Sequence, residues 1–287
     1  MSKTKDSTKV KDPNSVSNTR ILAECALMLA VGIVLSLVKL IDLPYGGSVT
    51  VASMLPVILI SYRHGVKYGL LTGLAFGIIQ QLLGLKTLSY VTTFISIIAV
   101  ILLDYVVAFA VIGFGGAFRK IIKNQPAALV AGAILACVLR YACHVISGAT
   151  VWAGLSIPTN AALIYSFGYN ATYMVPETIV TAALAYYIGS LIDFRNPTIK
   201  HMPQTAKTKV PLLFWTGGLA LAAGLIVDIA SIFPHLQNPE SGEFDFAGLA
   251  NVNWMVVLIA TVAAIVIAAI SFGIASLKKN KNEQAEK

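Results

Sequence analysis

Ionisable and aromatic side chains gather in one stretch of an otherwise apolar chain. Arg140 and His144 stand four residues apart in a long apolar run, and Trp152 follows eight residues after the histidine. Polar side chains at membrane depth are costly, and they usually face a cavity or one another. An indole face and a nearby carboxylate suit a flat cation, through cation–π contact and charge pairing. The stretch therefore predicts one wall of a ligand site.

Other polar side chains are expected at a similar depth in neighbouring segments. Asp104 lies near the middle of the preceding apolar run, and the next run carries Tyr165, Tyr169 and Asn170 in its first part. Residues four apart share a helix face, so Arg140 lies one turn deeper than His144. Five of these residues can meet in the outer half of one helical bundle: Asp104, His144, Trp152, Tyr165 and Asn170. Imidazole and amide groups both donate and accept hydrogen bonds, as a heteroaromatic amine requires.

Each of these residues also has a purely structural interpretation. Trp152 and the tyrosines could form an interfacial aromatic belt. Asp104 could simply neutralise Arg140, because buried charges tend to pair. Glu24 and Glu177 are two further acids in apolar segments, and for both we favour a structural pairing role.

Composition identifies the chain as an integral membrane protein. Of its 287 residues, 57% are hydrophobic and 12% are charged, with a mean hydropathy of +0.78, whereas soluble domains have about 25% charged residues. The apolar runs are long and do not alternate, which favours membrane-spanning helices. The formal charge of +8 is distributed in short clusters between the apolar runs, which indicates membrane topology rather than nucleic-acid binding.

Eight apolar segments define the expected organisation: 21–38, 48–62, 66–84, 94–115, 127–149, 160–192, 212–233 and 253–277. Segment 48–62 is short for a span and is expected to extend into its flanks, and the first part of 160–192 is expected to be irregular or interfacial. The predicted division is a polar tail 1–19, a six-helix membrane domain 20–195, a basic linker 196–211, a transmembrane hairpin 212–277 and a tail 278–287.

Charge placement predicts the orientation. All of the 21 lysines and arginines except Lys39, Lys86 and Arg140 fall on one side of these segments. Cytoplasmic loops are enriched in such residues. Both termini are therefore expected to be cytoplasmic in a multi-pass protein of the cell membrane, without a cleaved signal peptide.

The chain has no motif that indicates an enzyme or a bound cofactor. Cys25, Cys137 and Cys143 all lie inside apolar segments and form no metal-spaced cluster. A phosphate-binding GxxxxGK[ST] loop, an HExxH motif and a GxSxG motif are also absent from the sequence. We expect no metal and no ATP site in this chain.

Residues 20–195 resemble the thiamine-specific substrate-binding subunits (S components, ThiT or YuaJ type) of energy-coupling factor (ECF) transporters. The similarity rests on the loop 45–56, on Ser61-Tyr-Arg-His-Gly65, on the acidic-Tyr pair within 103–109, and on two pairs of residues. These pairs are His144 with Trp152 and Tyr165 with Asn170. The resemblance implies an all-α bundle of six helices, to which this chain adds two C-terminal transmembrane helices.

The resemblance also implies roles for individual residues. Asp104 would face the thiazolium cation, although some members carry Glu there, and Trp152 would stack on that ring. His144, Tyr165 and Asn170 would surround the aminopyrimidine. Tyr105, Gly148 and Tyr169 complete the expected site, whereas Gly47 stands where some members have a gating Trp. Ala26 and Ala30 would contact the coupling subunit, and small residues one turn apart do allow close helix approach.

Two functions from different classes remain open at this point. The first is a thiamine-binding subunit that captures the vitamin outside and depends on a separate coupling membrane subunit and a pair of ATPases. The alternative is an autonomous proton- or cation-coupled transporter, in which Asp104, Arg140, His144 and Glu177 would form a proton relay.

Overall fold

The computed structural model describes residues 17–43, 46–91, 93–152, 159–202, 212–236 and 247–285. Three predicted features lie wholly or largely outside these ranges: the tail before residue 17, Tyr45 of the quoted loop, and most of the basic linker. The C-terminal tail is described to residue 285.

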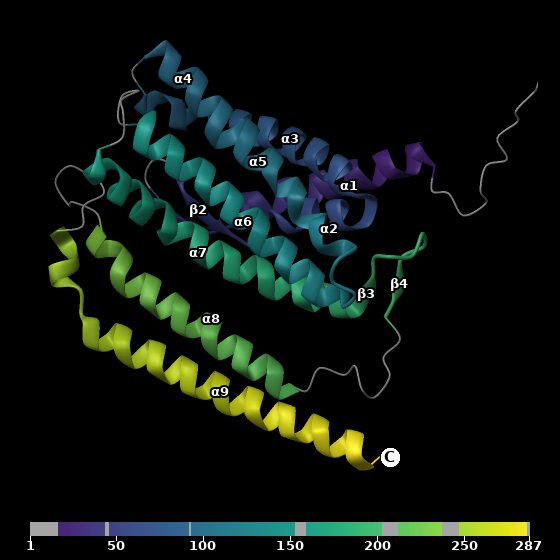
Figure 1. Cartoon of the computed structure of the whole chain (residues 1–287). Coiled ribbons are helices and arrows are strands. Elements are labelled where there is room, and N and C mark those ends of the chain that lie inside the picture. The colour runs from purple at the N-terminus through teal and green to yellow at the C-terminus, as the bar shows by residue number, and fades with distance from the viewer. Residues whose placement is uncertain are drawn as a thin grey trace, which may run out of the picture.

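The chain forms an all-α membrane protein with two small strand pairs (Figure 1). Its helices are α1 (Asn18–Leu37), α2 (Leu55–His64), α3 (Val66–Leu83), η2 (Leu85–Tyr90), α4 (Phe94–Val100), η3 (Ile101–Val107), α5 (Ala108–Ala110), η4 (Val111–Arg119), α6 (Gln125–Thr150), α7 (Asn160–Leu191), α8 (Leu212–Ile232), η6 (Phe233–Leu236), η7 (Ala247–Asn251) and α9 (Trp254–Ala285). Its strands are β1 (Lys39–Asp42), β2 (Ser48–Thr50), β3 (Ile192–Asp193) and β4 (Lys200–His201). Within the described ranges, seven helical stretches are long and apolar enough to cross a membrane.

Local sequence explains where several of these helices begin. Ser17, Thr93, Asn124 and Thr159 each stand just before a helix, and each side-chain oxygen accepts a hydrogen bond from a backbone N–H of the first turn. Such caps satisfy donors that have no partner within the helix. The helical boundaries therefore follow from polar residues that interrupt the apolar runs.

Two sequence-based expectations about the segments are corrected, the first in full and the second in part. Segment 48–62 does not extend into a full span, because β2 pairs antiparallel with β1 and leaves only the ten-residue α2 beneath the hairpin. The first part of segment 160–192 is not irregular: α7 is continuous over 32 residues, with Pro176 inside it. Its start is set by the Thr159 cap, which supports regular helix from Asn160 onward.

The span Phe94–Arg119 changes its winding along its length. Between α4 and α5 lies η3, a π-helical stretch, and the span ends in the 3₁₀ helix η4. Glycines of α3 allow this span to pack closely: an added Cβ at Gly73 would lie 2.4 Å from the Phe109 carbonyl oxygen, and one at Gly77 would lie 2.4 Å from that of Tyr105. A π-helical turn rotates the residues that follow it relative to an α-helix, and such turns are frequent at functional sites.

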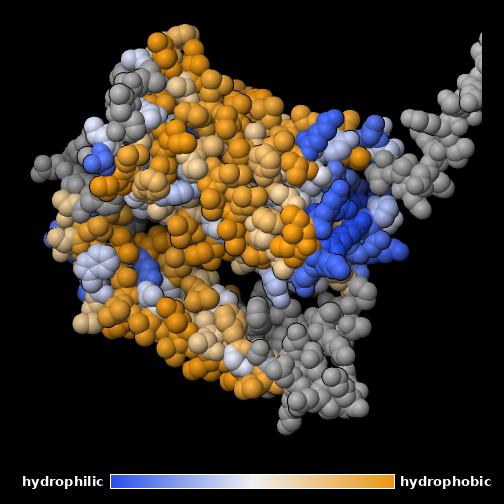
Figure 2. Space-filling view, viewed as in Figure 1, coloured by the Kyte–Doolittle hydropathy of each residue, from blue (hydrophilic) through white to orange (hydrophobic). Residues whose placement is uncertain are grey.

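A cluster of arginines ties together the polar end of the bundle, which Figure 2 shows as a hydrophilic region beside a broad apolar surface. The Glu24 carboxylate accepts hydrogen bonds from Arg63 Nε at 2.6 Å and from His64 Nε2 at 2.7 Å. Arg63 also donates to the carbonyl oxygens of Asn196 and Pro197, both at 2.7 Å. The structure thus shows the pairing role expected for Glu24. Through Arg63, this cluster joins α1, α2 and the turn after α7.

The C-terminal helices α8 and α9 pack mainly on each other and lie beside α7 (Figure 1). Thr261 donates a 2.7 Å hydrogen bond to Asp228, and Gly224 allows α8 to approach Ala264 closely. The predicted two-helix addition is therefore present, and α9 continues through the predicted tail to Ala285.

The closest backbone approach in the body yields a stability prediction. A Cβ at Gly132 of α6 would lie 1.8 Å from the Gly115 carbonyl oxygen. We expect Gly132→Ala to push α6 away from η4 and to destabilise the protein by about 1–3 kcal/mol, as overpacking does. Thermal unfolding in detergent measures this effect. Gly273→Ala in α9 is the matched control, because nothing lies within 4 Å of its added Cβ; equal unfolding temperatures for the two variants would contradict the packing shown here.

Candidate ligand-binding site

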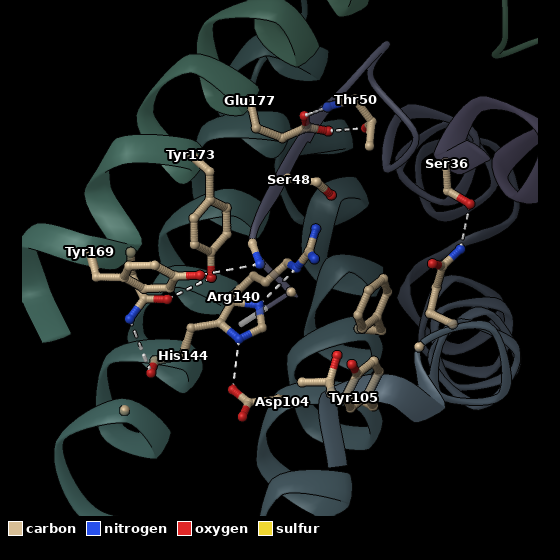
Figure 3. Close-up of a pocket in the computed structure, with 18 of the residues that line it drawn as sticks. Ser36, Ser48, Thr50, Asp104, Tyr105, Arg140, His144, Tyr169, Tyr173 and Glu177 are labelled. Carbon is tan, nitrogen blue, oxygen red and sulfur yellow. Dashed lines mark hydrogen bonds and ion pairs between the residues drawn. The ribbon is translucent and has the colours of Figure 1, made fainter. Parts of the chain in front are cut away.

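A cavity of about 360 Å³ lies inside the bundle, between the β1–β2 hairpin, α3, η3, α6 and α7. Its size is within the range of small-molecule sites. Figure 3 shows polar side chains from different helices pointing into it. The lining includes Ser36, Gly47, Thr50, Gln80, Asp104, Tyr105, Phe109, Arg140, His144, Gly148, Trp152, Tyr165, Tyr169, Asn170, Tyr173 and Glu177.

The Asp104 carboxylate is the centre of a hydrogen-bond network. Its Oδ1 lies 2.8 Å from Nδ1 of His144, and its Oδ2 accepts from Ser147 Oγ at 2.6 Å and from Trp152 Nε1 at 3.1 Å. Three side-chain donors therefore form hydrogen bonds to one carboxylate inside the bundle. Such bonds hold a charged group where it would otherwise be strongly disfavoured.

Arg140 reaches this network only through His144. Arg140 Nε donates to His144 Nε2 at 3.2 Å, and a guanidinium group has no acceptor atoms. His144 Nε2 must then be the acceptor, so its proton is on Nδ1 and is donated to Asp104. The direct Asp104–Arg140 neutralisation considered from the sequence is not present, because Arg140 forms no ion pair with any described residue.

The η3 turn and the glycines beside it place Asp104 and Tyr105. The Tyr105 ring stacks on the Phe109 ring, with 6.2 Å between the ring centroids. The Arg140 guanidinium lies over the same Phe109 ring, at 4.2 Å from its centroid. A Cβ at Gly84 would lie 2.8 Å from the Tyr105 hydroxyl oxygen, so a glycine leaves room for this ring. These contacts form an aromatic and cationic wall opposite α7.

Helices α6 and α7 are held together at the level of the site. Asn170 Nδ2 donates to the carbonyl oxygens of Ser166 at 2.9 Å and His144 at 3.3 Å, while its Oδ1 accepts from the Tyr173 hydroxyl at 2.5 Å. An added Cβ at Gly148 would lie 2.3 Å from Ser166 Oγ. Gly148 thus serves close helix approach, and the Asn170 amide is already occupied by these bonds.

The β1–β2 hairpin covers the cavity and is held by α7. Gly47 N–H donates to the Tyr169 hydroxyl at 3.4 Å, and a Cβ at Gly47 would lie 2.8 Å from the Tyr173 ring. Deeper in the cavity, Glu177 accepts from the Thr50 backbone N–H at 2.6 Å and from the Thr50 hydroxyl at 2.7 Å. Glu177 is only 1% exposed.

All eight residues expected at the site from the sequence line this one cavity, namely Asp104, Tyr105, His144, Gly148, Trp152, Tyr165, Tyr169 and Asn170. Ala26 and Ala30 lie elsewhere, on an exposed face of α1. Sequence reasoning missed Phe109 and Tyr173 as lining residues, and it missed Ser147 as a partner of Asp104. Phe109 follows Tyr105 by four residues, and that spacing could have revealed it.

The lining of this cavity has the chemistry of a site that recognises an organic molecule. Within the described ranges, no group of three or more His, Cys, Asp or Glu residues is placed to hold a metal ion. The cavity instead combines a hydrogen-bonded carboxylate, an indole next to it and several phenol rings. Such a surface suits a flat, positively charged organic molecule.

Comparison with known proteins places this body in a family. The family model described as thiamine transporter protein (Thia_YuaJ) matches residues 22–193. Thiamine transporter ThiT of Bacillus subtilis (strain 168) is 39% identical over 172 residues, which cover 56% of this chain and 85% of that protein. A solved structure of ThiT from Listeria monocytogenes is 24% identical, with a TM-score of 0.48 over 58% of this chain and 92% of that one.

The Asn170 network predicts a loss of stability when it is removed. Asn170→Ala would leave the Tyr173 hydroxyl and two buried acceptors without this amide, so we expect about 1–3 kcal/mol of destabilisation. Ser190→Ala is the control, because its hydroxyl bonds only within its own helix, to the Tyr187 carbonyl oxygen. Thermal unfolding in detergent compares the two. A variant at Asn170 that unfolds at the same temperature as the control would show that the amide does not tie α6 to α7.

Proposed function

This chain belongs to the thiamine transporter protein family (Thia_YuaJ), and from that premise we propose that it is the thiamine-binding S component of an ECF-type uptake transporter. The family is one of transporters, so the chain is a transport protein and not an enzyme. It is a multi-pass membrane protein. In the proposed function, the cavity captures thiamine from the outside and delivers it to a coupling complex.

The contact between Trp152 and Asp104 is the observation that carries this proposal. Trp152 Nε1 lies 3.1 Å from the Asp104 carboxylate, so an aromatic face and a negative charge border the same cavity. A thiazolium ring is flat and carries a positive charge, and both features match this pair. The three donors to Asp104 are neutral, and therefore they orient the carboxylate without cancelling its charge.

The remaining site residues fit the rest of the ligand. Tyr165 stacks on Tyr169 with ring planes 1° apart, and both line the cavity beside Gly148. We assign the aminopyrimidine to this aromatic side, near His144 and Asn170. Because the Asn170 amide already bonds to neighbouring groups, its main role in this assignment is to shape the wall.

The face of α1 that carries Ala26 and Ala30 is the proposed contact for the coupling subunit. Both alanines are exposed on the bundle, together with Ala23, Leu27 and Val31. Small residues let another helix approach the backbone closely. The coupling subunit in turn would recruit the pair of ATPases.

The charge distribution supports cytoplasmic termini and an outward-facing cavity. Arg63, Arg119 and Arg195 gather at the polar end. In Figure 1, β2 lies toward the opposite end of the bundle from β3 and β4, and residues of the β1–β2 hairpin line the cavity. Positive residues accumulate on the cytoplasmic side. In this assignment, residues 20–195 form the binding domain, and 212–277 form a hairpin that contributes none of the described residues that line the cavity.

The binding proposal predicts strong effects at Trp152 and Asp104. A desolvated cation–π contact is worth about 2 kcal/mol, so Trp152→Ala should weaken thiamine binding by about thirtyfold. Asp104→Asn should weaken it by about tenfold or more, because the charge facing the cation is lost. Isothermal titration in detergent measures both.

Matched controls for these two variants come from the C-terminal hairpin. Trp254→Ala and Asp228→Asn change the same residue types outside the cavity, and both should bind thiamine as the unmodified protein does. Unchanged affinity in the Trp152 and Asp104 variants would remove the site assignment.

A second experiment separates the S-component function from an autonomous transporter. The hydrogen-bonded pair Asp104 and His144 could in principle pass a proton, which keeps the alternative open. We expect proteoliposomes with this chain alone to bind thiamine without accumulating it, and accumulation to require the coupling subunit, the ATPases and ATP. Uptake by the lone chain that follows an imposed pH gradient would favour the proton-coupled alternative.

A further inference from the structure

The charges inside the cavity do not cancel. Among the described residues that line the cavity, the basic side chains are Lys39 and Arg140, and the acidic side chains are Asp104 and Glu177. Lys39 lies on the exposed hairpin and pairs with Asp42 at 2.9 Å, so this lysine is already neutralised. The interior is left with two carboxylates and one guanidinium group.

Arg140 stands between two acidic regions and pairs directly with neither. Its Nε–H bonds to neutral His144, with Asp104 on the far side of the imidazole ring. In Figure 3 its guanidinium group extends from α6 toward the side of the cavity where Ser48, Thr50 and Glu177 lie. Its cation is stabilised by the Phe109 ring, 4.2 Å away, rather than by contact with a carboxylate.

Glu177 is buried at this depth and is hydrogen-bonded to the β1–β2 hairpin. Both carboxylate oxygens receive hydrogen bonds from Thr50, one of them from a backbone N–H, which can only donate. The Thr50 hydroxyl also lies 2.8 Å from Ser53 Oγ, and its oxygen accepts from the Ser53 backbone N–H at 3.2 Å. Both bonds from Thr50 stabilise the ionised form of Glu177, against the desolvation that its burial imposes.

We propose that Glu177 is a specificity-determining residue that makes the cavity selective for a cation, because it offsets the charge of Arg140. With Glu177 ionised, the interior carries one net negative charge, which a singly charged ligand such as thiamine neutralises. Without Glu177, the net charge of the interior is zero, so a cation loses part of its advantage over an uncharged molecule of the same shape. This inference rests on the proposed thiamine-binding function.

The Glu177 carboxylate also anchors the hairpin through Thr50. A lower thiamine affinity in a Glu177 variant could therefore come either from the lost charge or from a displaced hairpin. The ratio of two affinities does separate them. We use thiamine and its uncharged thiophene analogue, in which carbon replaces the thiazolium nitrogen. Any distortion of the cavity affects both ligands alike, whereas the net charge affects only the cation.

The experiment measures both dissociation constants by isothermal titration for the unmodified protein, Glu177→Gln, Arg140→Gln and the double variant. The preference for thiamine over the analogue should fall by about tenfold in Glu177→Gln and rise by a similar factor in Arg140→Gln. In the double variant it should return to the value of the unmodified protein, because one net negative charge is restored.

The outcomes distinguish this inference from the function on which it rests. If the unmodified protein binds neither ligand, the proposed thiamine function itself fails. If it binds thiamine but the preference is the same in all four proteins, Glu177 does not set charge selectivity, and the inference is overturned. Should Glu177→Gln fail to fold, the rise in Arg140→Gln is still required, and its absence also overturns the inference.

Discussion

The binding site depends on one constraint: a carboxylate buried in a membrane bundle must be held by donors that do not abolish its charge. Asp104 meets this constraint through His144, Ser147 and Trp152, which come from α6 and the residues directly after it. An ion pair with Arg140 would have stabilised Asp104 more simply, but it would have removed the attraction for a cation. The imidazole ring of His144 keeps the two charges apart while it connects them.

The packing of the bundle serves this arrangement. The π-helical η3 presents Asp104 and Tyr105 to the cavity, and the α3 glycines allow that turn to lie close to the neighbouring helix. Asn170 and Gly148 bring α7 against α6, so that the tyrosines of α7 reach both the cavity and the hairpin above it. The arginine cluster joins α1, α2 and the turn after α7 at the opposite end of the bundle. The rigid helical frame and the covered cavity therefore depend on the same set of helix contacts.

Much of this could be predicted from the sequence, because apolar runs, polar caps and basic loops each have a local physical cause. The depth of Asp104, His144 and Asn170 in successive runs was sufficient to bring them together. The β1–β2 hairpin and the short α2 could not be predicted, since hydropathy does not distinguish a covered strand from a helix end. The π-helical turn and the position of His144 between Arg140 and Asp104 could not be predicted either, because both depend on which side chains meet in the folded bundle.

In the proposed complex, thiamine occupies the cavity with its positive ring between the Trp152 indole and the Asp104 carboxylate. An experimental structure of the protein with thiamine bound, in lipid nanodiscs, tests it most directly. We expect the thiazolium ring in contact with the Trp152 ring and beside Asp104, beneath the hairpin that Glu177 anchors. Thiamine bound elsewhere, or with its thiazolium facing Arg140 and away from Asp104, would rule out this binding mode.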